Sequence, residues 1–151
     1  MKNITFSNTF YSVTMRKNKC EEVFDMVRKI ETPDAPAAIG PYSQAVIWEK
    51  LIFVSGQLPV DPGTGVFPAG GIKEQTRQSL ENVRQILTAA GSGMDKVLSV
   101  TVYLQNMGDF AEMNEVYGEY FKREALPARA AVQAAALPRG AMVEIGVIAC
   151  T

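Results

Sequence analysis

Residues 126–146, LPARAAVQAAALPRGAMVEIG, contain two apolar segments joined by Pro-Arg-Gly. β-Branched residues in such segments favour strands, and Pro followed shortly by Gly is typical of a turn. The stretch therefore predicts two strands that end the chain as a hairpin. Arg129 opens the first of them and Glu144 lies inside the second, so a cation and a carboxylate stand among small apolar side chains.

Both charged residues have a structural explanation and a chemical one. Arg129 can cover an edge strand with its stem while its head meets water, and Glu144 can be the solvent-facing residue of a half-buried strand. Alternatively, a guanidinium can grip a carboxylate through two hydrogen bonds, and a desolvated carboxyl protonates readily or pairs with a cation. In a hairpin the two would be diagonal neighbours at best, or they would meet across an interface; the pattern leaves both open.

The residues upstream predict alternating strands and helices. SQAVIWE and LIFVSG favour a hairpin that turns at Glu49 and Lys50. Apolar residues recur at spacings of three and four from Ile72 to Ala90, which predicts a helix that stops at Gly91. KVLSVTVYLQN follows as a strand, with its residues Leu98, Val100, Val102 and Leu104 expected on one fully apolar face.

A second helix is expected over GDFAEMNEVYGEYFKR, residues 108–123. Asp109 with Glu112 three positions later resembles a capping box. The expected buried face consists of Phe110, Met113, Tyr117 and Tyr120.

This order of elements favours an α+β domain with one mixed sheet and both helices on one face. Strand 97–104 and the closing segments alternate apolar residues on both faces, so the other sheet face would be too apolar for a monomer. We therefore expect self-association through that face.

The composition excludes several classes of function. The chain has 151 residues, which fits one domain, and a net charge of -1, which gives no bulk attraction to nucleic acid or anionic membrane. It contains no histidine, so histidine-activated nucleophiles and the commonest metal ligand are absent. Cys20 and Cys150 are far apart, which suggests neither a disulfide framework nor a zinc site and makes a reducing compartment the default.

Residues 1–25 differ from the domain expected over 26–151. The first twenty residues contain four basic residues, no acid and many hydroxyls. That composition fits a disordered leader or an upstream start, with Met15 or Met26 as alternative starts, of a cytoplasmic protein. It fits more loosely a transit peptide for a mitochondrion or another organelle.

Other candidate site residues lie in loops and on the second helix. Tyr42 in GPYS can hydrogen-bond a ligand or anchor a loop. Ser55 and Gly56 end a strand, and the glycine allows close backbone approach. Asn114 is unfavourable in mid-helix unless its amide reaches a partner.

Five segments resemble motifs of the reactive-intermediate deaminase family, also called RidA or YjgF-like: APAAIGPYSQAV, IFVSGQLPVDPGTG, QTRQSLENVRQIL, DFAEMNEVYGEYF and PARAAVQAAALPRGAMVEIGVIA. They occur in the family's order and extend from about Ile30 to the C-terminus. The resemblance implies a chorismate-mutase-like fold with a six-stranded mixed sheet. It also implies a homotrimer with a central β-barrel and sites at the subunit interfaces.

The resemblance further implies hydrolysis of 2-aminoacrylate, as 2-iminopropanoate, and of 2-iminobutanoate to 2-keto acids and ammonia, with no metal or organic cofactor. Arg129 would hold the substrate carboxylate, and Glu144 would orient water and move its proton. The other residues that match the family's substrate-binding positions are Tyr42, Ser55, Gly56, Asn114 and Ala131.

Two positions depart from the pattern of many relatives. Ala131 stands where they have cysteine, which excludes regulation through a thiol there, and Gly146 stands where some have a second acid, which widens the pocket. The alternatives to a deaminase are a non-catalytic trimer that binds small carboxylates, and an endoribonuclease or translation inhibitor. The net charge of -1 disfavours RNA as a partner.

Overall fold

The computed structural model describes residues 26–121, 124 and 126–151. The predicted leader, residues 1–25, lies outside the described residues. The strands are β1 (Arg28–Ile30), β2 (Ala45–Trp48), β3 (Leu51–Gln57), β4 (Val97–Leu104), β5 (Ala128–Gln133) and β6 (Val143–Cys150). The helices are α2 (Ile72–Ala89) and α3 (Phe110–Tyr120), with short 3-10 turns at Met94–Lys96, Met107–Asp109 and Pro138–Gly140.

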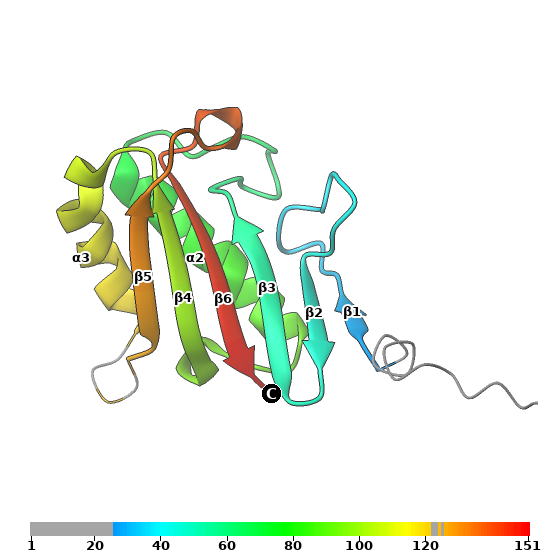
Figure 1. Ribbon diagram of the computed structural model, residues 1–151. Helices are drawn as coiled ribbons and strands as arrows, with labels where there is room; N and C mark the ends of the chain where they lie inside the picture. The colour runs from blue at the N-terminus through cyan, green and yellow to red at the C-terminus, as the bar shows by residue number, and fades with distance from the viewer. Residues whose placement is uncertain (1–25, 122–123, 125) are drawn as a thin grey trace, which may run out of the picture.

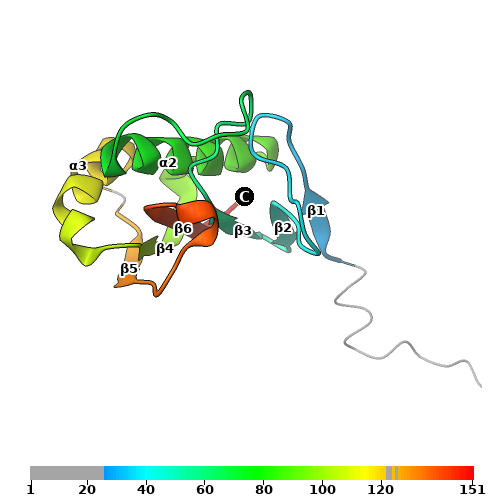
Figure 2. The ribbon, with the colours of Figure 1, turned by 90° about the horizontal axis from the view of Figure 1, so that it is seen from above.

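The strands form one six-stranded sheet in the order β1-β2-β3-β6-β4-β5 (Figure 1). β4 and β5 are parallel and the other neighbours are antiparallel. Seen from above, α2 and α3 lie on the same side of the sheet (Figure 2). The predicted mixed sheet with two helices on one face is therefore confirmed, as is the β2–β3 hairpin. The other side, here called the open face, carries no helix of the described chain.

The predicted hairpin of the last two strands is wrong, because β4 lies between β5 and β6. Pro138–Gly140 forms a 3-10 turn within a longer connection that passes over the end of β4. Ala134 N donates to Leu104 O at 2.8 Å, and Gln105 N donates to Met142 O at 2.9 Å, so both ends of this connection are tied to β4. β6 thus pairs with β3 on one side and with β4 on the other, and β5 becomes an edge strand.

The first helix follows its predicted pattern. Its residues Ile72, Thr76, Leu80, Val83 and Leu87 are buried against the sheet. The helix ends where expected, because Gly91 adopts φ +78°, a left-handed conformation that glycine tolerates best.

The second helix is shorter than predicted and starts differently. Its buried residues are Met113, Val116 and Tyr117, whereas Phe110 and Tyr120 are half-buried. The predicted capping box is wrong, since Asp109 makes no side-chain capping bond. Instead Asn106 Oδ1 accepts from Gly108 N at 2.9 Å and starts the preceding turn. Asp109 is then already helical, with φ -83° and ψ 0°, rather than extended as a capping residue must be.

The alternation in β4 is interrupted near its start. A register shift between Val97 and Ser99 leaves Leu98 49% exposed and buries Val97, so the prediction that Leu98 joins the buried face is wrong. Beyond the shift, Val100, Val102 and Leu104 are buried beneath the helices as expected.

The open face exposes apolar side chains, as predicted, around a polar centre that contains Ser99, Thr101 and Glu144. Phe53, Tyr103, Val132 and Ile148 are each at least 36% exposed there. They form two cross-strand pairs, Phe53 beside Ile148 and Tyr103 beside Val132. Patches of this kind on a soluble protein mark interaction surfaces.

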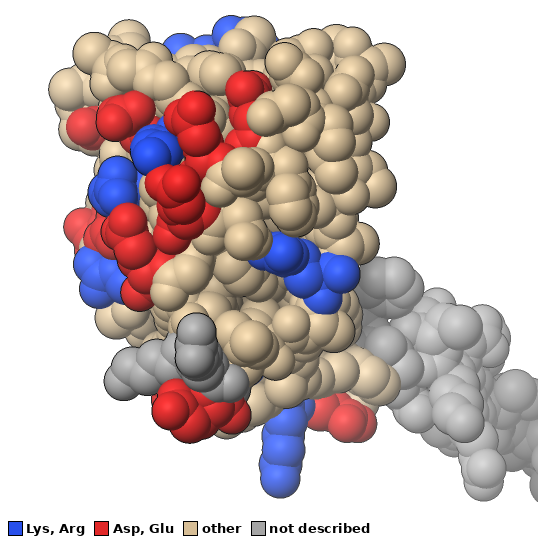
Figure 3. Space-filling model, turned by 90° about the vertical axis from the view of Figure 1, so that its left-hand side faces the viewer, with Lys and Arg blue, Asp and Glu red and all other residues tan. Residues whose placement is uncertain are grey.

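The helical side is charged instead. Lys73 pairs with Glu115 at 2.6 Å and Arg77 with Glu119 at 3.0 Å, which joins α2 to α3. Figure 3, which views the α3 side, shows basic and acidic side chains interspersed. Exposed pairs of this kind are screened by water and add little to stability. No helix in the described ranges has the length and apolar character of a membrane span.

Candidate active site

Arg129 lies on the edge strand β5, where its backbone is opposite Val100. Its Nη1 donates to Asn114 Oδ1 at 2.7 Å. Its Cζ lies 4.4 Å from the centroid of the Tyr117 ring and 5.6 Å from that of Phe110. Because a guanidinium has five N–H donors, this cluster positions the cation while leaving donors for a ligand.

The Arg129 cluster borders a hollow of ≈ 430 Å³, which is also lined by Gly118, Leu126 and Pro127. Asn114 has the partner that its unfavourable mid-helix position called for. Burial raises the pKa of Tyr117, while the nearby Arg129 acts in the opposite direction. Sequence reasoning placed Tyr117 only in the core, although it follows Asn114 by three residues and so shares its helix face.

Glu144 lies on β6 opposite Tyr103, between the buried Val143 and Ile145, and points to the open face. Burial raises the pKa of the Glu144 carboxyl above its ordinary value. The carboxylate rests against Gly56: a Cβ built there would lie 1.9 Å from Glu144 Oε1. Gly56 sits where β3 shifts register, between Val54 and Gln57. The carboxylate can therefore keep this position only while residue 56 has no side chain.

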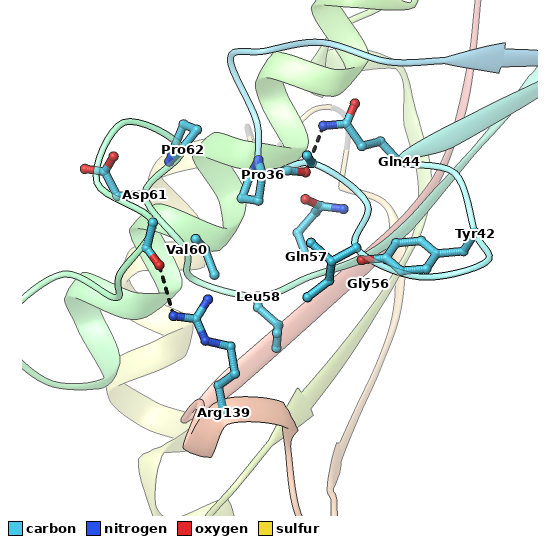
Figure 4. Close-up of a pocket in the computed structure, with 13 residues that line it drawn as sticks. Pro36, Tyr42, Gln44, Gly56, Gln57, Leu58, Val60, Asp61, Pro62 and Arg139 are labelled. Atoms are coloured by element: carbon cyan, nitrogen blue, oxygen red, sulfur yellow. Dashed lines mark hydrogen bonds between the residues drawn. The ribbon is translucent and has the colours of Figure 1, made fainter.

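Ser55 and Tyr42 lie next to Gly56, and together with Glu144 these residues form a second cluster. Ser55 Oγ donates to Ser43 O at 2.7 Å, and Ser55 N donates to Gln44 O at 3.0 Å, so this serine fastens the loop that precedes β2. Tyr42 is 51% exposed at the tip of that loop. Figure 4 shows Tyr42 beside Gly56, at one end of a cavity.

The predicted residues therefore form two clusters that do not meet within one chain. Arg129 on β5 pairs with Val100 on β4, and Val100 pairs with Val147 on β6, which lies three residues beyond Glu144. With ~4.8 Å between strands and ~3.3 Å per residue, the two Cα atoms lie about 14 Å apart. Arg129 contacts α3 on the helical side, whereas Glu144 points to the open face.

Ala131 belongs to the Arg129 side. It pairs with Val102 and packs against the core, so it does not reach Glu144. Of the two arrangements that the sequence left open, diagonal neighbours in a hairpin are excluded. A meeting across an interface between copies remains. Within residues 26–121, 124 and 126–151, no group of three or more His, Cys, Asp or Glu side chains could hold a metal ion.

Comparison with known proteins agrees with the fold. The family model described as endoribonuclease L-PSP matches residues 32–151. A RutC family protein of Pyrococcus horikoshii is 52% identical over 124 residues, which cover 82% of this chain and 98% of the relative. A 2-iminobutanoate/2-iminopropanoate deaminase of Mus musculus is 51% identical over 125 residues, covering 82% and 92%. The crystal structure of RidA from an Antarctic Psychrobacter species matches with a TM-score of 0.78 and 44% identity, covering 82% and 99%. The chain therefore belongs to the endoribonuclease L-PSP family, also called the RidA or YjgF family.

Proposed function

We propose that the protein hydrolyses reactive 2-imino acids, among them 2-iminopropanoate and 2-iminobutanoate, to 2-keto acids and ammonia. The observation that carries this proposal is the Arg129 cluster, in which Asn114 and the Tyr117 ring fix a guanidinium beside an open hollow. A fixed guanidinium suits a small carboxylate, which every 2-imino acid carries. Relatives about half identical to this chain bear the name of that activity.

The reaction needs little more than placement and proton transfer. Water adds to the carbon of the C=N bond, the resulting carbinolamine loses ammonia, and a C=O bond replaces C=N. Glu144 takes the proton from the attacking water and returns it to the nitrogen. Its raised pKa, caused by burial, brings the carboxyl closer to the pH at which both transfers are efficient. Such help accelerates reactions by typically ~10²–10⁴-fold.

The proposed site needs more than one copy of the chain, since Arg129 and Glu144 point to opposite sides of their own sheet. We propose a homotrimer in which the open faces pack together and the β5 edge of one copy approaches Glu144 and Gly56 of the next. Burial of Phe53, Tyr103, Val132 and Ile148 would drive this assembly.

Mixing inactive variants tests the shared site. Arg129→Ala and Glu144→Gln proteins, each inactive alone, are unfolded together and refolded. If each site takes its arginine and its glutamate from different copies, about a quarter of the sites in random mixtures are intact. Activity near that fraction supports the shared site, and no recovery in trimers of confirmed mixed composition contradicts it.

The activity itself is tested by supplying 2-aminoacrylate from a generating enzyme and measuring pyruvate release. Arg129→Ala should abolish the acceleration, and Arg129→Lys should reduce it severely because the planar fork is lost. Arg84→Lys, an exposed α2 residue paired with Glu81, is the matched control. Full activity in Arg129→Ala would refute the assignment. Carboxylate binding in titration calorimetry without turnover would instead select a non-catalytic binding trimer.

A further inference from the structure

A separate cavity of ≈ 320 Å³ lies between the loop that precedes β2 and the loop that follows β3 (Figure 4). Tyr42 and Gly56 lie at one end of it, and Asp61 and Arg139 at the other. Most of the wall between them is apolar: Pro36, Ala37, Ile39, Leu58, Val60 and Pro62.

The polar groups near the loop before β2 already have partners. Gln44 Nε2 donates to the carbonyls of Thr32, Ala35 and Pro36 at 3.0, 3.1 and 2.8 Å. Gln57 Nε2 donates to Ser55 O at 3.0 Å. These bonds hold the wall in place, so the amides act as supports of the cavity.

Hydrogen bonds also hold the polar side chains at the other end of the cavity. Asp61 Oδ1 accepts from Gly63 N at 2.7 Å and from Thr64 N at 3.1 Å. Arg139 Nη2 donates to Gly65 O at 2.9 Å, and its Cζ lies 5.1 Å from the centroid of the Phe67 ring. An acidic and a basic residue thus line the same end, both bonded to the loop that follows β3, which favours neither an acidic nor a basic ligand group there.

The cavity begins beside the proposed reaction centre. Gly56 lines both this cavity and the hollow on the open face that contains Glu144. A substrate whose C=N carbon lies next to the carboxylate therefore has an apolar space within reach of its side chain.

We propose that this cavity is the side-chain pocket of the deaminase, and that it selects 2-imino acids with branched or aromatic apolar side chains over the imine of alanine. This inference rests on the proposed function. The space suffices, since an apolar cavity of about 150 Å³ already holds benzene. Each added methylene in such a pocket is worth about 10-fold or more in kcat/KM. The imine of leucine should therefore exceed that of alanine by at least ~10-fold.

The test uses an amino-acid oxidase to supply imines from alanine, leucine, phenylalanine and glutamate, with semicarbazide as a competing trap. Faster hydrolysis lowers the yield of semicarbazone. Two variants fill the pocket: Leu58→Trp from the half-buried wall and Ala37→Phe from the exposed loop. Either should lower the leucine-to-alanine ratio of kcat/KM by at least ~10-fold. Ala38→Phe, one residue along the loop and outside the cavity lining, should leave the ratio unchanged.

The outcomes separate the two proposals. Failure to hydrolyse any of the imines refutes the deaminase. Hydrolysis with equal rates for alanine and leucine, a preference for glutamate, or an unchanged ratio in folded Leu58→Trp and Ala37→Phe refutes the apolar side-chain pocket and leaves the deaminase standing.

Discussion

Replacing Gly56 by alanine should disable the Glu144 carboxylate without disturbing the fold. The added Cβ would lie 1.9 Å from Oε1, 2.8 Å from Cδ and 3.0 Å from Cγ of Glu144. An ordinary contact begins near 3.4 Å, so the carboxylate oxygen must retreat by about 1.5 Å. Gly56 is not among the glycines with positive φ, and alanine therefore adopts its backbone without strain.

A misplacement of about 1 Å in a reacting group can reduce the rate ~10²-fold. We therefore expect kcat for imine hydrolysis to fall about 100-fold in Gly56→Ala. KM should change little, because Arg129 in the other cluster is the group proposed to hold the substrate carboxylate. The urea midpoint of unfolding should stay close to that of the wild type. Steady-state kinetics with the semicarbazide competition and a urea titration measure these quantities.

Two comparisons isolate the cause. Gly146→Ala is the matched change on the same face, and its Cβ would meet Val54 O at 3.6 Å, an ordinary contact, so its effect should be much smaller. In a Glu144→Ala background, Gly56→Ala should reduce the remaining rate by less than about threefold, since the displaced group is gone. A Gly56→Ala enzyme that keeps more than about a third of the wild-type kcat would refute this reasoning.

Three further predictions concern stability, pH and ligand binding. Gln44→Leu removes four hydrogen bonds to the loop before β2 and should lower the free energy of unfolding by about 2–5 kcal/mol in urea titrations; a loss below about 1 kcal/mol would contradict this. Burial raises the pKa of Glu144 in the folded state, so the folded protein favours the protonated carboxyl. The free energy of unfolding of the wild type should therefore fall relative to that of Glu144→Gln as pH rises from about 4 through the raised pKa. A constant difference in unfolding free energy from about pH 4 to 8 would exclude such a shift. Tyr117→Leu removes the ring that packs on Arg129 and should weaken benzoate binding about 2–5-fold in calorimetry. Tyr117→Phe keeps the ring and should bind benzoate with the wild-type affinity. Equal affinity of the two variants for benzoate would show that the ring does not contribute to binding.

Local patterns predicted the parts of the fold that depend on neighbours in sequence. The helical spacing from Ile72 to Ala90 and the glycine stop at Gly91 need only the chain itself. The insertion of β4 between β5 and β6 depends on pairing between distant segments. β4, α3 and β5 form a parallel β-α-β unit, which brings β5 to the outer edge of β4 and leaves the inner edge for β6. The Pro-Arg-Gly sequence at 138–140 is typical of a hairpin turn, so it favoured direct pairing of the last two strands over the insertion of β4.

The same distinction applies to the candidate site. The residues could be named from the motifs, and Asn114 could be suspected from its mid-helix position. That Arg129 and Glu144 point to opposite sides followed only from the register of three strands, because one step along a strand moves a side chain to the other face. The cavity below Tyr42 could not be predicted either, since its wall is built by loops whose shape depends on the bonds of a buried Gln44.

The division of the site between two sides of the sheet links assembly to chemistry. A single copy presents Arg129 at its β5 edge and Glu144 on its open face. In the proposed reaction neither residue suffices alone. Packing the open faces together would bury apolar side chains and the surroundings of Glu144 in one step. That burial would raise the pKa of the carboxyl further, because it removes water from the charged form. On this view the association that stabilises the protein also tunes its general base, while the side-chain cavity, which lies within one copy, sets the choice of substrate independently.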